Sequence, residues 1–248
     1  MSDSLKLVLL QTGYAVPLVQ NECGTFPTLF RQGLDLANVD YELDVIEIQH
    51  AAPERIPACD GVIVSGSPSM IAENTDWMQR SKKLMSHVLD DDVPLLGVCF
   101  GHQLLGSILG ADVGPNAKGR AIGTIDVDRL VDAELEDSFF KDLPTSFAAQ
   151  VSHVDVIREI GDHLVVVGKS SHDGCHMVRA KSSLAWGVQF HPEFTKEVSL
   201  RYLRTRREVL DAEQGEGTAA RKADELRSSH DGGHQTLAAF LRWVAAHA

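Results

Sequence analysis

The sequence predicts an α/β fold with a mainly parallel central sheet, covered by helices on both faces and extended by antiparallel or mixed strands. Two observations support this. Strand patterns alternate with helix patterns in the first 100 residues, whereas after Gly119 strand patterns follow one another with little helix between them. The 248 residues, 44% of them apolar, are enough to fill a sizeable core. We therefore expect one domain over residues 1–248, with residues 196–248 as a C-terminal helical segment packed on it.

The first half of the chain alternates between the two patterns. Short apolar runs predict strands over residues 5–10, 41–48, 61–65 and 95–98. Apolar residues at helical spacing predict a helix over 26–37, and a second helix is expected at about 75–89. Crossover helices of this length connect parallel strands.

The second half begins with strands and ends with helices. Strands are predicted over residues 121–127, 146–151, 164–168, 176–180 and 184–190. A helix is predicted over 195–210, and its basic residues Arg201, Arg204, Arg206 and Arg207 are interpreted as a solvated face, with docking to an acidic partner as the alternative. Residues 212–234 are expected to be a polar surface loop with some helix, and a last helix begins at Thr236.

Charge and hydropathy argue against several classes of protein. The net charge of −12 and the isoelectric point of about 5.3 predict neither nucleic acid nor an anionic membrane as a partner. No apolar stretch approaches the roughly 18 residues that a membrane span needs, and the start lacks a basic region before its apolar run. We expect a cytoplasmic protein.

The cysteines do not form the patterns of a disulfide framework or a structural zinc site. They are far apart and lack C-x-x-C pairing, so we expect reduced thiols at Cys23, Cys59, Cys99 and Cys175. The segment HDGCH is interpreted as a polar hairpin turn, the alternative being a metal site formed by His172, Cys175 and His176. No metal or organic cofactor is expected.

Cys99 is the first candidate for chemistry. It follows the apolar strand 95–98 directly and lies between Gly97 and Gly101, in the pattern G-x-C-x-G, at the start of a helix pattern. A helix N-terminus favours the reactive thiolate form of cysteine, and glycines allow the sharp turn that presents it. The alternative is a small buried hydrophobe with glycines that permit tight packing.

A second segment, FHPEF, supplies a base and an acid. His191 follows the strand 184–190, and Glu193 lies two residues further on, across Pro192. A cysteine nucleophile needs a base for its proton, and that base needs an orienting acceptor. Cys99, His191 and Glu193 are therefore candidates for a triad, although a capping histidine and a solvated glutamate are the alternative for the HPE motif alone.

A third segment, SGSP, lies at the end of the strand 61–65. Backbone N–H groups of such a turn, together with the N–H of Phe100, are suited to bind the oxyanion of a tetrahedral intermediate. An ordinary β-turn with no such role is the alternative.

With GVCFGHQ, HPE and SGSP in this order, the chain resembles the class I glutamine amidotransferases from about Leu5 to Thr195. It looks most like the GMP synthase branch and its stand-alone relatives, because SHVD at residues 152–155 also matches that branch. The resemblance implies a flavodoxin-like three-layer sandwich. It also implies that Cys99 is the nucleophile, His191 the base and acid, and Glu193 the orienting acid.

The same resemblance assigns residues to substrate binding. It implies that oxyanion N–H groups come from Gly66 and Phe100, and that Gln103 contacts the amino-acid end of the substrate. Ser67 replaces the second glycine of the Gly-Gly-Pro turn found in many members, as in stand-alone γ-glutamyl peptidases. His153 and Asp155 are expected either to shape the rim of the pocket or to serve the structure.

The implied reaction is hydrolysis of the side-chain amide of glutamine through a γ-glutamyl thioester on Cys99. The sequence has no SGGxDS or Walker A motif, so a separate synthase subunit would receive the ammonia. A self-sufficient γ-glutamyl hydrolase or peptidase is the second hypothesis, and a non-catalytic binding module is the third. The substrate is expected to be glutamine or a small γ-glutamyl molecule.

Overall fold

The structure is a computed structural model that describes residues 4–50, 53–130 and 139–248. In these residues a central sheet has the strand order β2-β1-β3-β4-β11-β10-β9-β6-β7. The parallel part consists of β1 (Leu5–Gln11), β2 (Tyr41–Glu47), β3 (Gly61–Val64), β4 (Leu95–Val98) and β11 (Ala185–Val188). The antiparallel part consists of β10 (Met177–Ala180), β9 (Leu164–Ser170), β6 (Ala121–Arg129) and β7 (Ser146–His153). The predicted parallel sheet with its antiparallel extension is confirmed.

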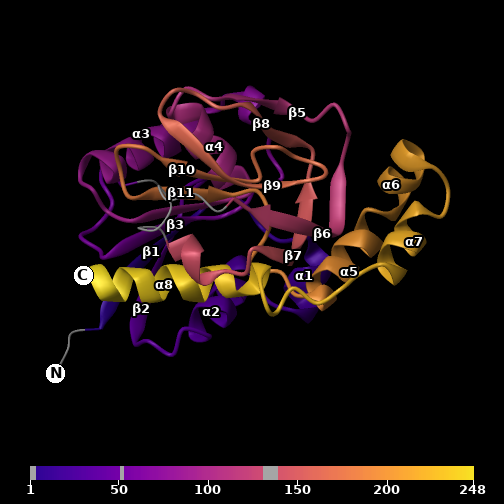
Figure 1. Cartoon of the computed structure of the whole chain (residues 1–248), viewed down its shortest axis with the longest axis horizontal. Helices are drawn as coiled ribbons and strands as arrows, with labels where there is room; N and C mark the ends of the chain where they lie inside the picture. The colour runs from indigo at the N-terminus through magenta and orange to yellow at the C-terminus, as the bar shows by residue number, and fades with distance from the viewer. Residues whose placement is uncertain (1–3, 51–52, 131–138) are drawn as a thin grey trace.

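Helices cover both faces of the parallel part (Figure 1). On one face α2 (Phe26–Asp35) and α8 (Thr236–His247) pack against Leu7 and Leu9 of β1. On the other face α3 (Asp76–Asp90) and α4 (Phe100–Ile108) pack against Val8 and Leu10 of the same strand. Both sets of side chains in β1 are buried, as an apolar run without polar alternation predicts.

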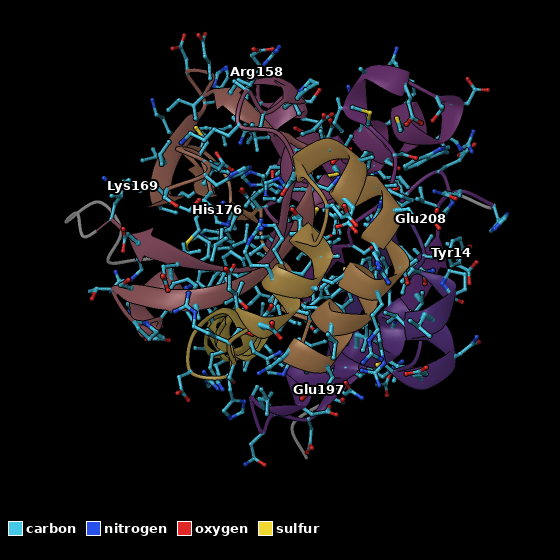
Figure 2. The ribbon with its side chains drawn as sticks, turned by 90° about the vertical axis from the view of Figure 1, so that its right-hand side faces the viewer. Tyr14, Arg158, Lys169, His176, Glu197 and Glu208 are labelled. Carbon is cyan, nitrogen blue, oxygen red and sulfur yellow. The ribbon has the colours of Figure 1, made fainter. Side chains whose placement is uncertain are left out.

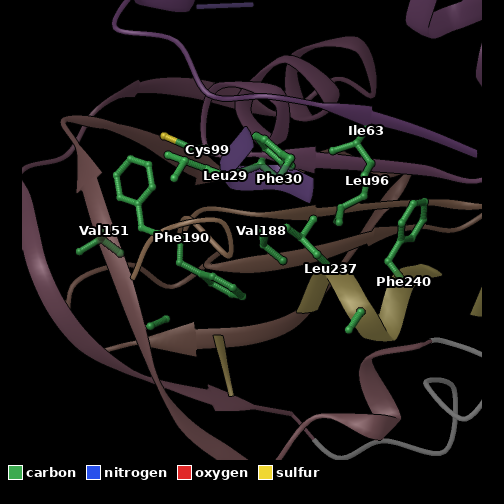
Figure 3. Packing of buried hydrophobic residues seen from close by; sticks show 14 of the residues in the cluster. Leu29, Phe30, Ile63, Leu96, Cys99, Val151, Val188, Phe190, Leu237 and Phe240 are labelled. Carbon is green, nitrogen blue, oxygen red and sulfur yellow. The ribbon is translucent and has the colours of Figure 1, made fainter. Parts of the chain in front are cut away.

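The larger core cluster connects the sheet to the last helix. Figure 3 shows Leu237 and Phe240 of α8 near Ile63, Leu96 and Val188, from three neighbouring strands. Burial of such side chains contributes roughly 1.5–3 kcal/mol each. The C-terminal helix is therefore an integral part of the core.

Between β11 and α8 the chain forms α5 (Lys196–Thr205), α6 (Arg207–Gln214) and α7 (Thr218–Asp224), which lie at one end of the molecule (Figure 1). The prediction of one helix over residues 195–210 was wrong in one respect, because the helix breaks at Arg206. There φ is −100° and ψ is 14°, so Arg206 ends α5 and precedes α6. The polar stretch 212–234 contains α7, in agreement with a loop that includes some helix.

Several short elements were not predicted. In the described ranges they are α1 (Pro17–Glu22), 3₁₀ turns at Ile71–Glu73, Phe139–Asp142 and Gly233–Gln235, and a small antiparallel sheet of β5 (Asp112–Pro115) and β8 (Asp155–Glu159). Pro17 begins α1, where its missing N–H costs nothing. Within the described ranges, no helix has both the length and the apolar character required to cross a membrane.

Candidate active site

Cys99 lies at the junction of β4 and α4, and β4 is flanked by β3 and β11 in the sheet. Its backbone has φ 51° and ψ −98°, a conformation that L-residues rarely adopt, and it stands at the N-cap of α4. Its N–H donates to the carbonyl of Val188 in β11 at 2.8 Å, which fixes the turn. The thiol is free and the residue is 4% exposed. Strain held by surrounding structure in this way is common at functional sites.

The two glycines around Cys99 allow this turn. A Cβ at Gly97 would lie 2.5 Å from the carbonyl oxygen of Gly101, and a Cβ at Gly101 would overlap the backbone of Val64 in β3. The first turn of α4 therefore folds back onto the strands, and only glycine fits at both positions.

His191 and Glu193 follow β11 and face the same junction. Nδ1 of His191 lies 2.7 Å from Oε1 of Glu193, which is fully buried. Since Nδ1 is engaged, we assign to Nε2 the hydrogen bond that His191 makes with the side chain of Cys99. Phe194 stacks on the imidazole at 4.0 Å and an angle of 11°, and Tyr202 of α5 packs on Phe194. The three predicted triad residues thus lie together.

Charges around His191 favour its protonated form. Burial lowers the pKa of this imidazole, but the negative charges of Glu193 and Cys99 and their hydrogen bonds outweigh burial and raise the pKa to about 10. An imidazolium between a carboxylate and a thiolate is the arrangement that a cysteine nucleophile requires.

The SGSP turn lies against both Cys99 and His191. Thr12, which is fully buried, donates its hydroxyl proton toward the carbonyl oxygens of Ser65 at 2.8 Å and Gly66 at 3.1 Å. In a trans peptide the N–H points opposite to the carbonyl, so the N–H groups of Gly66 and Ser67 point away from Thr12. In the described part of the chain, the N–H groups of Gly66, Ser67 and Phe100 have no hydrogen-bond acceptor. Free donors beside a nucleophile are suited to an oxyanion.

Gln103 and His153 lie at the other side of Cys99. The amide of Gln103 donates to the carbonyl of Asp155 at 2.7 Å and to Oε1 of Gln189 at 3.2 Å. Nδ1 of His153 lies 3.2 Å from the same Asp155 carbonyl, and burial lowers its pKa well below the usual value. Burial also raises the pKa of Asp155. His153 and Asp155 both line the cavity, and both take part in hydrogen bonds that hold its wall together. They therefore combine the rim position and the structural role that the sequence left open.

A cavity of about 180 Å³ opens above Cys99, and the predicted residues Ser67, Gln103 and His153 also line it. It is lined by Ser67, Pro68, Ser69, Met70, Cys99, Gln103, Arg120, Ser152, His153, Val154, Asp155 and Arg206. Three of the residues around it were missed from the sequence. Gln189 donates toward Cys99 Sγ at 3.6 Å, and Arg120 and Arg206 line the cavity. The interpretation of Arg206 as part of a solvated face was therefore wrong, because it lies one turn after buried Tyr202, on the side of the helix that faces the protein.

The HDGCH segment forms a turn between β9 and β10. Asp173 and His176, both buried, pair at 3.3 Å, and His172 contacts the carbonyl of Gly119 at 3.1 Å. Burial raises the pKa of Cys175 to about 11. Among the described residues, no three His, Cys, Asp or Glu side chains are grouped so that they could hold a metal ion.

Curated proteins with similar sequences include one from an archaeon and one from a plant. The chain is 34% identical to a GMP synthase [glutamine-hydrolyzing] subunit of Methanococcus vannielii, over 56% of this chain and 67% of that protein. It is 30% identical to gamma-glutamyl peptidase 5 of Arabidopsis thaliana, over 62% of this chain and 61% of that protein.

A solved structure shares the fold of this chain, and a family model matches its sequence. The crystal structure of a glutamine amidotransferase from Thermotoga maritima matches with a TM-score of 0.69 and 19% identity, over 97% of this chain and 98% of that one. The model of the family "Glutamine amidotransferase class-I" matches residues 29–206, more than half of the chain. This chain belongs to the class I glutamine amidotransferase family.

Proposed function

We propose that this protein hydrolyses the side-chain amide of glutamine, or the equivalent bond of a γ-glutamyl compound, through a thioester on Cys99. The observation that carries the proposal is that Cys99, which lines the cavity, hydrogen-bonds to His191 and lies beside the Gly66–Ser67 turn, whose N–H groups are free like that of Phe100. Glu193 supports it, because its carboxylate holds His191 in the tautomer that serves Cys99.

In the first step the Cys99 thiolate attacks the amide carbon and forms a C–S bond. The negative charge that develops on the amide oxygen is bound by the N–H groups of the Gly66–Ser67 turn and of Phe100. The imidazolium of His191 donates its proton to the amide nitrogen. The C–N bond then breaks and ammonia, or an amine, leaves.

In the second step water hydrolyses the thioester. Neutral His191 accepts a proton from the water, whose oxygen attacks the thioester carbon in the same oxyanion site. The C–S bond breaks, glutamate leaves, and the thiolate–imidazolium pair is restored. Glu193 remains ionised throughout and stabilises the imidazolium.

Two fates of the nitrogen are proposed. Similarity to proteins named as GMP synthase subunits supports transfer of ammonia to a separate synthase. Similarity to a γ-glutamyl peptidase supports a self-sufficient hydrolase. Both would act in the cytoplasm, which is in keeping with free thiols at Cys23, Cys59, Cys99 and Cys175.

The test is turnover of glutamine and of γ-glutamyl dipeptides by the isolated chain, with glutamate release as the measurement. Cys99→Ala should abolish release from every substrate, while Cys23→Ala, the matched control at another free thiol, should leave it unchanged. Mass spectrometry of the intact chain should show one γ-glutamyl group on the native protein and none on Cys99→Ala. Activity that survives Cys99→Ala would rule out this nucleophile.

A further inference from the structure

The cavity above Cys99 has a cationic part, because Arg120 and Arg206 both line it. Asp155 also belongs to the lining, and its backbone carbonyl accepts a hydrogen bond from Gln103. Neither arginine takes part in the proposed reaction. Two guanidinium groups in a concave site, close to a reactive thiol, are suited to bind an anionic group.

The position of Arg206 follows from the helix that carries it. One turn before it, Tyr202 packs on Phe194, which stacks on the imidazole of His191. Arg206 is therefore on the imidazole side of Cys99. Figure 2 shows the ribbons of α5 to α7 in front of this end of the sheet, with Glu197 and Glu208 marking the helices on either side of the break. Since His191 protonates the departing nitrogen, Arg206 faces the leaving group.

Arg120 is already paired, whereas Arg206 is not fully satisfied. The guanidinium of Arg120 donates two hydrogen bonds to the carboxylate of Glu213 in α6, at 2.8 and 3.0 Å. The buried Nε of Arg206 has no hydrogen-bond partner in the residues that the structure describes. Burial, and then the positive charge of Arg120, lower the pKa of Arg206. A bound anion would offset both the burial of the Arg206 charge and its repulsion by Arg120.

We propose that Arg206, supported by Arg120, binds a carboxylate on the amine portion of the substrate. The proposal rests on the proposed function and narrows its substrate class to γ-glutamyl compounds whose departing amine carries a carboxylate, as in a γ-glutamyl dipeptide. Glutamine releases ammonia and offers no such group. The γ-glutamyl portion itself occupies the side of the cavity with Gln103 and Asp155.

The test compares two substrates that differ only in that carboxylate, γ-glutamylglycine and γ-glutamylglycinamide. A charge-assisted hydrogen bond is worth about 10- to 100-fold in selectivity. We expect the native protein to prefer γ-glutamylglycine by that factor in kcat/KM, and Arg206→Gln to bring the ratio close to one. Arg206→Lys should recover part of the preference. Arg204→Gln, at an exposed arginine two residues earlier on the same helix, should retain all of it.

Binding to the Cys99→Ala variant, measured by calorimetry, separates this proposal from the reaction itself. The same preference for γ-glutamylglycine should be present there and be lost in Cys99→Ala/Arg206→Gln. If the preference in binding is found but the native protein forms no thioester, the proposed function fails and the carboxylate site stands. Equal kcat/KM values for the two substrates with the native protein would overturn the proposed carboxylate site. An equal loss with both substrates in Arg206→Gln would also overturn it, because Arg206 would then act on Cys99 or on the γ-glutamyl portion.

Discussion

The imidazole of His191 occupies the space that a side chain at Gly66 would need. A Cβ added to Gly66 would lie 2.8 Å from Cε1 of His191 and 3.6 Å from Cβ of Cys99. The turn with the free N–H groups and the imidazole beside the thiol are therefore close neighbours. Neither can shift without the other.

Gly66→Ala should lower turnover far more than stability. The added methyl group would lie 2.8 Å from Cε1, so the imidazole would move by roughly 1 Å to reach an ordinary contact distance, and a misplacement of that size costs about 100-fold in rate. The measurement is kcat/KM for glutamine beside the melting temperature. Gly174→Ala is the control, since a Cβ there meets nothing within 4 Å. Turnover within twofold of native would contradict the proposed geometry.

Thr12→Val should loosen the same turn. Thr12 donates to the carbonyls of Ser65 and Gly66, and valine keeps the shape of the side chain while leaving both buried oxygens without this donor. We expect a loss of about 1–3 kcal/mol in the free energy of unfolding, and a lower kcat. Denaturant titration and steady-state kinetics measure the two effects. Thr12→Ser retains the hydroxyl and should stay close to native in both.

Glu193→Gln should move the alkaline limit of activity. With Glu193 and Cys99 as neighbours, the pKa of His191 is raised to about 10, so activity that needs the imidazolium should persist up to that pH and fall above it. Removing the negative charge of Glu193 lowers this pKa and shifts the limit to lower pH. A pH profile of kcat/KM measures the shift. Glu208→Gln, at an exposed position of α6, should leave the profile unchanged.

The raised pKa of His191 also predicts how stability depends on pH. The folded-state pKa of about 10 lies above the value of about 6.5 expected in the unfolded chain, so the folded state binds the proton more tightly. The resulting stabilisation is fully present below pH ~6.5 and is lost as pH rises toward 10. Unfolding of the native protein and of His191→Gln across this range should converge at high pH. Parallel curves would show that the imidazolium does not contribute.

Gly101→Ala should destabilise the fold itself. The new Cβ would overlap the backbone of Val64 in β3, which cannot move away as a flexible side chain could. Overpacking of this kind costs about 1–3 kcal/mol or more. Chemical denaturation measures it, and Gly174→Ala again serves as the comparison. A native-like midpoint would mean that α4 can move away from the sheet.

The sequence predicted the sheet well because its strands are apolar on both faces, or alternate clearly, and last four residues or more. It missed β5, whose sequence DVGP contains glycine and proline, and α1, which begins at a proline. It predicted one helix across Arg206, because Val198, Tyr202 and Leu210 keep helical spacing through the break. The spacing of apolar residues in a sequence does not reveal that a helix is interrupted at one turn.

The candidate site was likewise predicted only in part. Cys99, His191 and Glu193 are in short motifs at strand ends, and the structure places them in contact, although their roles in catalysis stay predictions. Arg206 lies four residues after Tyr202 and four before Leu210, so helical spacing could have separated it from Arg204 and Arg207, which are exposed. Gln189 was missed because, unlike His191 in HPE, it belongs to none of the short motifs that pointed to the site, and its contact with Cys99 is visible only in the fold.

Cys99 and His191 belong to a different part of the chain from Arg206, so mutations in the two parts are expected to have different effects. Cys99 and His191 come from adjacent central strands, which the surrounding core constrains, whereas Arg206 lies at a helix break after the last strand of the sheet. From the proposed carboxylate site we expect mutation near that break to change which substrates are accepted while Cys99 and His191 stay in place. Exchange of residues 206–225 between relatives is therefore a practical route to altered selectivity on an unchanged scaffold.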